Sequence, residues 1–407
     1  MRPIILTIFI FISTINSVFT QWIQTESFTA AVTCLISVPA SDLPGGEVLY
    51  LGLEGNEGVW RSTDGGDTWT ETAMNDRTVF ALAARGSYIF AGTDEDGIYF
   101  TSNGGSTWNQ TSVANRTVYG FTEAGGYLYA GTKDYGVYCS ANNGITWFQT
   151  SLNNKTVKSL SSFGSTVFAG TLLNGVYKSP NLGTTWTQTP LNNLHIVCIA
   201  VNGTNNEVLA GTDTGLYSST NLGQSWSNYY HDFEVLSVIL SGGTIVTGTD
   251  GGVRISYDNG TTWVQRNEGL NGNPLLRTLS VSGNDIIAGV TDHRDAIGNY
   301  VYKRPLNEII GIKVLSSEVP DRFRLLQNYP NPFNPATSIR FSIKSSSEVN
   351  LSVFNSSGQQ VAELVNKNLS PGEYEYKFDA ENLPSGIYFY RLTAEKFSET
   401  KKMILVK

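Results

Sequence analysis

Short apolar runs alternate with polar turns along most of this chain. Residues 78–112 show the pattern clearly, because the runs "TVFALAA", "SYIFAGT", "GIYFTS" and "TWNQTS" follow one another there. β-Branched and aromatic residues fill these runs, which is typical of strands. Gly and Asn separate them, which is typical of turns. The pattern therefore predicts four short strands in this segment.

The four-run pattern recurs with a nearly constant period. One tryptophan marks each unit, and successive tryptophans lie 37 to 40 residues apart, at Trp69, Trp108, Trp147, Trp186, Trp226 and Trp263. Four strands in about 40 residues predict one blade of a β-propeller. First strands begin near Ala31, Thr78, Thr117, Thr156, Ile196, Val235 and Thr278. Seven first strands predict an all-β, seven-bladed β-propeller over residues 21–305.

The last unit lacks its fourth strand. Residues 275–305 contain three strand-like runs and no further box or tryptophan. Residues 21–27, "QWIQTES", look like the fourth run of the other units. We therefore expect 21–27 to pair with 300–304, so that an N-terminal strand closes the ring. Closure removes the exposed edges that an open array of sheets leaves.

An eight-residue box ends at each of the six tryptophans. The boxes read "STDGGDTW", "TSNGGSTW", "SANNGITW", "SPNLGTTW", "STNLGQSW" and "SYDNGTTW". We expect the Asp or Asn side chain to bond to its own turn, Gly to permit positive φ, and Trp to pack between sheets. The key position is Asp only at Asp64 and Asp258, whereas a calcium loop needs several carboxylates. We therefore interpret the boxes as structural turns.

These boxes resemble the Asp-box, or BNR repeat, S-x-D-x-G-x-T-W. The resemblance covers residues 21–305 and implies a propeller. The repeat occurs in sialidases, xyloglucan-active glycosidases, sortilin-type receptors and photosystem II assembly factors. Because these families differ in chemistry, the resemblance does not specify a function.

The repeat period ends after residue 305. Residues 306–325 are predicted to form a linker. Strand-like runs then follow at 349–354, 359–365, 373–379, 386–394 and 400–406. Turn signals separate them, and the alternation in "EYEYKFDA" and "GIYFYRLTA" predicts a small antiparallel β-sandwich over 326–407.

This C-terminal segment resembles the type A sorting domain of the type IX secretion system. The resemblance rests on "NYPNPFNPAT" (328–337), "LPSGIYFYRL" (383–392) and "ETKKMILVK" (399–407). It implies export by the Sec pathway and then by the type IX machinery, which would be a partner of this segment. In this family the domain is commonly removed, and the cargo is attached to surface lipopolysaccharide or released.

The N-terminus predicts a secretory signal peptide over residues 1–20. Arg2 precedes an apolar stretch that runs from Pro3 to Ile12, and small or polar residues follow. The stretch is too short to span a bilayer, and no other segment is long enough. The sequence therefore predicts a secreted or cell-surface protein with no membrane span; the alternative is a retained anchor.

Charge and cysteine content narrow the classes of ligand. The net charge is −8, which argues against a general nucleic-acid binder. Cys34, Cys139 and Cys198 are too far apart in the sequence to predict a disulfide framework or a metal site, and we interpret them as small buried apolar residues. We therefore expect no metal and no cofactor.

Cations recur just before the predicted first strands, which line the axis of a propeller. Aligning the repeats places Arg77, Arg116, Lys155, His195 and Arg277 at this position. A ring of cations suits carboxylate or sulfate groups, because arginine offers bidentate contacts. These residues are our candidate site for an acidic glycan or protein. The alternative is a solvated rim in which nearby acids pair with the cations.

Catalytic signals are sparse in this sequence. It has no GxSxG, HExxH or P-loop motif, no Arg-Ile-Pro motif of the sialidases, and no long insertions. Acids such as Asp94 and Asp213 would suit a glycosidase pair, but short loops build no deep cleft. We expect a noncatalytic module that binds a glycan or a protein. The alternatives are a sialidase-like or xyloglucanase-like glycoside hydrolase, and a structural adhesin.

Overall fold

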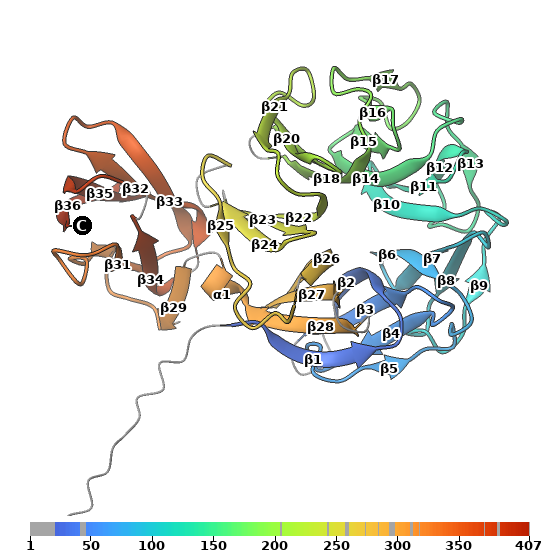
Figure 1. The fold of residues 1–407 in the computed structure, drawn as a ribbon, viewed down its shortest axis with the longest axis horizontal. Helices are drawn as coiled ribbons and strands as arrows, with labels where there is room; N and C mark the ends of the chain where they lie inside the picture. Colours follow the sequence, from blue (N-terminus) through green and yellow to red (C-terminus); the bar gives the residue numbers. More distant parts are fainter. Residues whose placement is uncertain are drawn as a thin grey trace, which may run out of the picture.

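The structure is a computed structural model that describes residues 21–40, 46–203, 206–241, 244–256, 260–272, 274–283, 285–292, 298–309, 312–316, 318–369, 371–380 and 383–406. Within these ranges the chain forms nine four-stranded sheets and one short helix, α1 (Leu306–Ile309). Seven sheets form a ring, and two sheets form a separate C-terminal unit (Figure 1). The expected signal peptide, residues 1–20, lies outside the described residues.

The first four sheets of the ring each use four consecutive strands. Sheet 1 contains β2 (Val32–Pro39), β3 (Glu47–Leu53), β4 (Val59–Ser62) and β5 (Thr70–Glu71). Sheet 2 contains β6 (Val79–Arg85), β7 (Tyr88–Thr93), β8 (Ile98–Thr101) and β9 (Asn109–Gln110). Sheet 3 contains β10 (Val118–Ala124), β11 (Tyr127–Thr132), β12 (Gly136–Ser140) and β13 (Phe148–Gln149). Sheet 4 contains β14 (Val157–Phe163), β15 (Thr166–Thr171), β16 (Gly175–Ser179) and β17 (Thr187–Gln188).

The last three sheets continue the order, and sheet 7 draws on both ends of the ring. Sheet 5 contains β18 (Ile196–Asn202), β19 (Glu207–Thr212), β20 (Gly215–Ser219) and β21 (Ser227–Tyr230). Sheet 6 contains β22 (Val235–Ser241), β23 (Thr244–Thr249), β24 (Gly252–Ser256) and β25 (Val264–Gln265). Sheet 7 contains β26 (Pro274–Ser282), β27 (Asp285–Asp292), β28 (Gly298–Pro305) and β1 (Ile23–Phe28).

The ring closes through its first strands. Each first strand contacts the first strand of the next sheet, and β26 of sheet 7 contacts β2 of sheet 1. The second strands pack tightly on the neighbouring sheet, which explains the glycine in the recurrent "AGT". A Cβ added at Gly92 would lie 2.7 Å from Cγ1 of Val118 in sheet 3. Small residues at this position therefore allow neighbouring sheets to approach.

The N-terminal strand completes sheet 7. β1 pairs antiparallel with β28, with Ile23 opposite Lys303 and Phe28 opposite Asn299. This pairing confirms the expectation for residues 21–27 and 300–304. Trp22 is almost fully buried, and its indole Nε1 donates to the carbonyl oxygen of Arg266 at 2.8 Å. Trp108 donates to Oγ1 of Thr72, the residue at the same position, three residues after the preceding tryptophan, so Trp22 occupies the tryptophan position that sheet 7 otherwise lacks.

Every first strand carries a β-bulge near its start. The register shifts by one residue in all seven, directly after a buried residue, which is the first residue of six strands and the third residue, Leu276, of β26. A bulge leaves one residue unpaired and redirects its side chain. The residues inserted in this way are Thr33, Phe80, Tyr119, Lys158, Val197, Leu236 and Arg277.

The C-terminal unit consists of two antiparallel four-stranded sheets. One contains β29 (Ile312–Ser316), β34 (Gly372–Asp379), β31 (Ala336–Ile343) and β30 (Arg324–Leu325). The other contains β33 (Gln360–Leu369), β32 (Ser347–Asn355), β35 (Gly386–Ala394) and β36 (Phe397–Leu405). Buried side chains of both sheets belong to one hydrophobic cluster, which includes Phe341, Leu351 and Tyr390.

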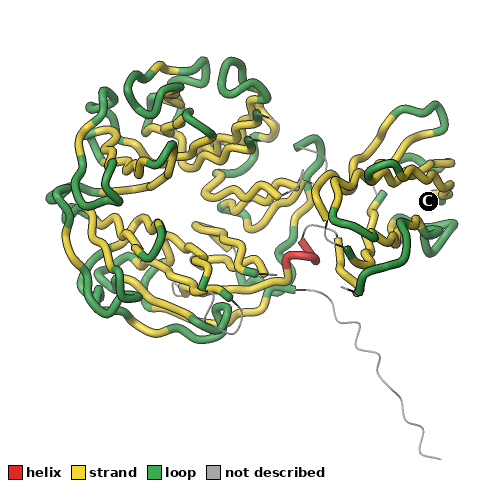
Figure 2. Tube along the Cα trace, turned by 180° about the vertical axis from the view of Figure 1, so that it is seen from behind, coloured by secondary structure: helices red, strands yellow, loops and turns green. Residues whose placement is uncertain are grey.

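The segment expected as a linker contains structured elements. Residues 306–325 include α1, β29 and β30, and the two strands pair with β34 and β31 of the C-terminal unit. Figure 2 shows the helix, in red, between the ring and this unit. Ile309 of α1 is fully buried, and it joins a cluster that also holds Trp22 of sheet 7 and Phe341. Strands this short leave little periodicity in a sequence, which explains why the pattern did not reveal them.

Candidate functional site

The antiparallel order gives the ring two faces with different loops. Loops between the third and fourth strands carry the boxes and lie on one face. Loops between the second and third strands, and those that lead to the next sheet, lie on the opposite face. We call the first the box face and the second the rim face, and every candidate binding residue lies on the rim face.

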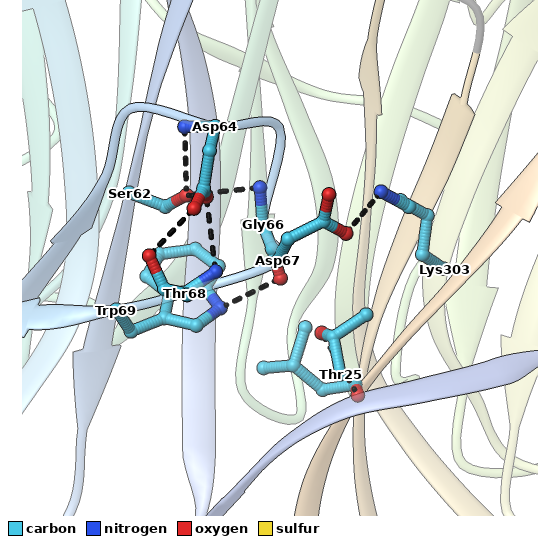
Figure 3. A network of polar contacts seen from close by, with 9 residues as sticks. Thr25, Ser62, Asp64, Gly66, Asp67, Thr68, Trp69 and Lys303 are labelled. Carbon is cyan, nitrogen blue, oxygen red and sulfur yellow. Dashed lines mark hydrogen bonds and ion pairs between the residues drawn. The ribbon is translucent and has the colours of Figure 1, made fainter.

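Each box is a self-contained hydrogen-bonded turn. In sheet 1 the hydroxyl of Ser62 donates to Oδ1 of Asp64 at 2.8 Å and accepts from the backbone N–H of Gly66 at 2.9 Å (Figure 3). The N–H of Thr68 donates to the same carboxylate at 2.9 Å, and the indole N–H of Trp69 donates to the carbonyl oxygen of Gly66 at 3.2 Å. Lys303 of sheet 7 pairs with Asp67 of the same turn. The carboxylate of Asp64 is therefore occupied by its own turn.

Asparagine supports the same turn when it replaces aspartate. In sheet 3 the Oδ1 atom of Asn142 accepts from Ser140 at 3.1 Å and from the N–H of Thr146 at 2.9 Å. One bond reverses its direction: Thr68 donates to Asp64, whereas the amide of Asn142 donates to Oγ1 of Thr146 at 2.9 Å. The acid is therefore not required for the turn. Asp258 of the sixth box lies outside the described residues.

The strand register corrects the alignment of the five predicted site residues. Arg77, Arg116 and Lys155 each lie two residues before the first buried residue of their strand. His195 lies one residue before Ile196, and Arg277 is the bulged residue that follows Leu276. The five residues thus occupy three different positions and form no single ring. The segments between sheets differ in length and so shift the repeats, and apolar spacing alone does not show these shifts.

Two of the predicted cations already have carboxylate partners. Arg77 pairs with Asp76 and, through Nε, with Asp96 at 3.3 Å. Arg277 pairs with Glu54 at 3.5 Å between Nη1 and Oε1. For these two residues the structure matches the alternative in which nearby acids pair with the cations.

Arg116 and Lys155, the other two predicted cations, differ from Arg77 and Arg277 in their partners. The guanidinium carbon of Arg116 lies 3.8 Å from the ring centroid of Tyr135, and its Nη1 donates to the carbonyl oxygen of Asn115 at 2.7 Å. Lys155 is half-buried. In the described part of the chain neither residue forms an ion pair.

A bulged lysine was missed by the sequence alignment. Lys158 of β14 is half-buried, and its Nζ lies 3.5 Å from the ring centroid of Tyr119, the bulged residue of β10. Tyr119 in turn contacts Phe80, the bulged residue of β6, with ring centroids 5.4 Å apart. Burial and, after it, the charge of Lys133 lower the pKa of Lys158. Three neighbouring bulges therefore bring two aromatic rings and one cation together.

The first loop residue after each second strand varies around the rim. In sheets 1 to 6 this residue is Glu54, Asp94, Lys133, Leu172, Asp213 or Asp250, and the equivalent residue of sheet 7 is Thr291, which lies within β27. Four are acids, and only sheets 3 and 4 place a lysine and a leucine there. The printed sequence contained this signal, because "TDED", "TKDY", "TLLN" and "TDTG" follow the strands directly.

The rim therefore has two unlike parts. We name Arg116, Tyr119, Lys133, Tyr135, Lys155, Lys158, Leu172 and Leu173 of sheets 3 and 4 the cationic sector. We name Asp213, Glu234 and Asp250 of sheets 5 and 6 the acidic sector. Among the described residues, none of the four cations of the cationic sector forms an ion pair.

Ionisable groups between and within the sectors are perturbed. Burial and, after it, the charges of Asp250 and Asp213 raise the pKa of Glu234. His195 lies between the sectors: burial and the charge of Lys158 lower its pKa, although Asp213 acts in the opposite direction. Its Nε2 atom is buried without a hydrogen-bond partner in the described chain. The rim thus holds a cation-rich arc beside an acid-rich one.

The described residues show no metal site, no paired cysteines and no membrane-spanning helix. No group of three or more His, Cys, Asp and Glu side chains within the described ranges is placed to hold a metal ion. Cys34, Cys139 and Cys198 are free, and burial raises the pKa of Cys34 and Cys198 to about 12. None of the helical residues that the structure describes forms a helix long and apolar enough to cross a membrane.

The ring is similar to propeller-like solved structures. The extracellular domain of BT4673, assigned to a hybrid two-component system of B. thetaiotaomicron, superposes with a TM-score of 0.58 at 16% identity over 80% of this chain and 45% of that one. YCF48 from Cyanidioschyzon merolae gives 0.54 at 13% identity, over 71% of this chain and 99% of that one. YCF48 bound to D1 peptide gives 0.53 at 15% identity, over 70% and 95%. These likenesses show the fold alone.

The C-terminal unit has a recognised family. Residues 327–407 match the family described as the secretion system C-terminal sorting domain. No curated protein matches the chain. A sorting domain of this kind implies interaction with the type IX secretion machinery and a secreted or cell-surface location. The chain therefore joins a propeller-like ring of four-stranded sheets to a type IX C-terminal sorting domain.

Proposed function

We propose that residues 21–305 form a seven-bladed propeller of the Asp-box type, that the two C-terminal sheets form a sandwich, and that a signal peptide at 1–20 starts export. Outside the cell the propeller acts as a noncatalytic module that binds an anionic ligand at its rim. Seven sheets in a ring and the repeated box bonds support the fold assignment. The sorting domain supports the location.

The observation that carries the binding proposal is the cationic sector. Four cations lie on two neighbouring sheets of a protein whose net charge is −8, and no ion pair among the described residues neutralises them. Cations gathered in this way repel one another unless counter-ions, acids or a ligand offset them. Arg116, Lys155 and His195 of the predicted site lie in or beside this sector. Arg77 and Arg277 contribute less, because carboxylates already pair with them.

A binding screen tests this proposal. The chain is presented to acidic and neutral polysaccharides and to acidic and neutral peptides at 50 mM and 300 mM salt. We expect binding to anionic members only, and weaker binding at the higher salt, because salt screens exposed charges within about 10 Å at 0.1 M. Binding to neutral members alone, or to none, contradicts the proposal.

The acidic sector favours one alternative, a glycoside hydrolase. The raised pKa of Glu234, beside two further acids, is an arrangement found in general acids. The test is hydrolysis of the same polysaccharides by the chain and by Glu234→Gln. Hydrolysis that disappears in the variant establishes the enzyme; no hydrolysis by either protein leaves the binding module.

A further inference from the structure

We propose that the cationic sector docks an extended acidic segment of a partner protein that also carries apolar side chains. This inference rests on the proposed function, because it specifies the ligand of the same rim. Its evidence is the exposed apolar side chains of the sector, Leu172, Leu173 and Tyr135. Binding of a simple anion does not account for these side chains.

Leu173 is the most unusual residue of the sector. It lies in the left-handed region with φ of +64°, and 65% of its side chain is exposed. The equivalent residues of sheets 2 and 3 are Glu95 and Asp134, which have φ of 61° and 63°. Asp tolerates this backbone because its side chain bonds locally, whereas leucine gains nothing from it. An exposed leucine in a disfavoured conformation is therefore explained better by contact with a partner than by folding.

Two further exposed apolar side chains lie beside Leu173. Leu172 is 38% exposed and Tyr135 is 42% exposed. Both loops meet at Thr156, which accepts from the N–H of Leu172 through its carbonyl oxygen and donates to Asp134 at 2.7 Å through its hydroxyl. The apolar residues of sheets 3 and 4 thus form a patch on two adjacent loops that Thr156 links. Such patches on a soluble protein mark interaction sites.

Charge complementarity sets the sign of the partner. Arg116 stacks on Tyr135 at the edge of the patch, and Lys158 lies on Tyr119. The lowered pKa of Lys158 shows that burial and Lys133 disfavour its charge, so an incoming carboxylate relieves this repulsion. The neighbouring acidic sector repels the same partner, which restricts it to sheets 3 and 4. Exposed leucines favour a protein over a glycan, because sugars stack on flat aromatic faces whereas aliphatic side chains fill protein interfaces.

Peptide selection on the purified full chain is the first test. A displayed library of random 12-residue peptides is selected on the immobilised protein at 50 mM salt. We expect enrichment of peptides that combine Asp or Glu with Leu, Ile, Phe or Met. Enrichment of basic or uncharged peptides, or no enrichment, overturns the inference.

Paired variants locate the binding. Leu173→Asn suits the left-handed backbone, so we expect its thermal midpoint to stay the same or rise while peptide affinity falls about tenfold. Lys158→Gln should weaken the same peptide about tenfold and reduce its salt dependence. Ile145→Asn is the matched control, because Ile145 is 55% exposed on the box face; it should leave affinity unchanged.

The outcomes separate this inference from the broader function. A peptide in which Asn replaces every acid, and one in which Ser replaces every apolar residue, should both bind at least about tenfold more weakly. An oligogalacturonate that binds tightly, with Leu173→Asn equal to the parent, overturns the protein partner and leaves an anion-binding rim. Absence of binding by both peptide and oligogalacturonate overturns the inference and the proposed function together.

Discussion

The two faces of the ring use their loops in opposite ways. On the box face, the same Ser or Thr to Asp or Asn bond recurs in sheets 1 to 5, with donor–acceptor distances between 2.8 and 3.1 Å. On the rim face, one equivalent position holds Glu, Asp, Lys, Leu or Thr. The comparison shows that the box turns restrict residue choice because their side chains carry backbone bonds. The rim positions carry fewer such bonds and are free to vary in charge.

The largest effect should come from Trp22, which stands in for a box tryptophan in sheet 7. Trp22→Ala removes a side chain that is 1% exposed, together with its bond to Arg266. We expect a loss of about 3–5 kcal/mol in the free energy of unfolding, measured by denaturant titration. Ile23→Ala is the control, because Ile23, the next residue and the first of β1, is 57% exposed. Equal effects of the two variants would show that the Trp22 position does not hold the ring closed.

The next largest effect belongs to the box hydroxyls. Ser140→Ala removes the acceptor of the buried N–H of Gly144 and the donor to Asn142. We expect a loss of about 1–3 kcal/mol, because a buried donor is left unsatisfied. Ile145→Ala, on the same turn but exposed, should change stability by less than about 0.5 kcal/mol. A neutral Ser140→Ala would contradict the assignment of the box as a structural turn.

A substitution at Lys158 on the rim face should leave the stability of the fold unchanged or raise it. Lys158→Met removes a charge that burial and Lys133 disfavour, while its apolar stem still packs on Tyr119. We expect the thermal midpoint to remain within about 2 °C of the parent or to rise, which corresponds to about 0.5 kcal/mol at most in the unfavourable direction. A marked loss of stability would mean that Lys158 is structural, and the contrast between the faces would fail.

The smallest effect concerns Glu234 and appears only as a pH dependence. Its pKa in the folded protein is raised, first by burial and then by Asp250 and Asp213. The folded state therefore binds the proton more tightly than the unfolded chain, and stability falls as pH rises through the folded pKa. Glu234→Gln should raise the thermal midpoint at pH 8 and leave it unchanged at pH 3.5. A shift of equal size at both pH values would exclude titration of this carboxyl as the cause.

The sequence allowed much of the fold to be predicted because its signals are local and repeated. The box around Asp64 and the tryptophan spacing define four runs per unit, and the resemblance of "QWIQTES" to the fourth run predicted the pairing of β1 with β28. The strands β29 and β30 were missed, because five and two residues are too few to show a period.

The positions of the candidate site residues on the rim were predicted less well than the fold, because they depend on where each first strand begins. The seventh first strand was expected to begin near Thr278, which aligns with Ala81 and not with Thr78, so Arg77 and Arg277 were placed at one position when they lie at two. Neither Lys158 nor Tyr119, the bulged residues of β14 and β10, was predicted as a site residue. The run of acids after the second strands, interrupted at Lys133 and Leu172, was a readable signal for the two sectors.

The pairing of β1 with β28 also constrains when the ring can close as the chain is made. The bond between Thr25 and the carbonyl oxygen of Val301 joins positions 276 residues apart, so the first strand of the chain finds its partner only after nearly the whole ring has been delivered. Until then, β1 and β27 each keep an unpaired edge, and such edges add strands from other chains. Closure of the ring therefore waits for β28, and a chain stalled before residue 298 would leave those edges unpaired.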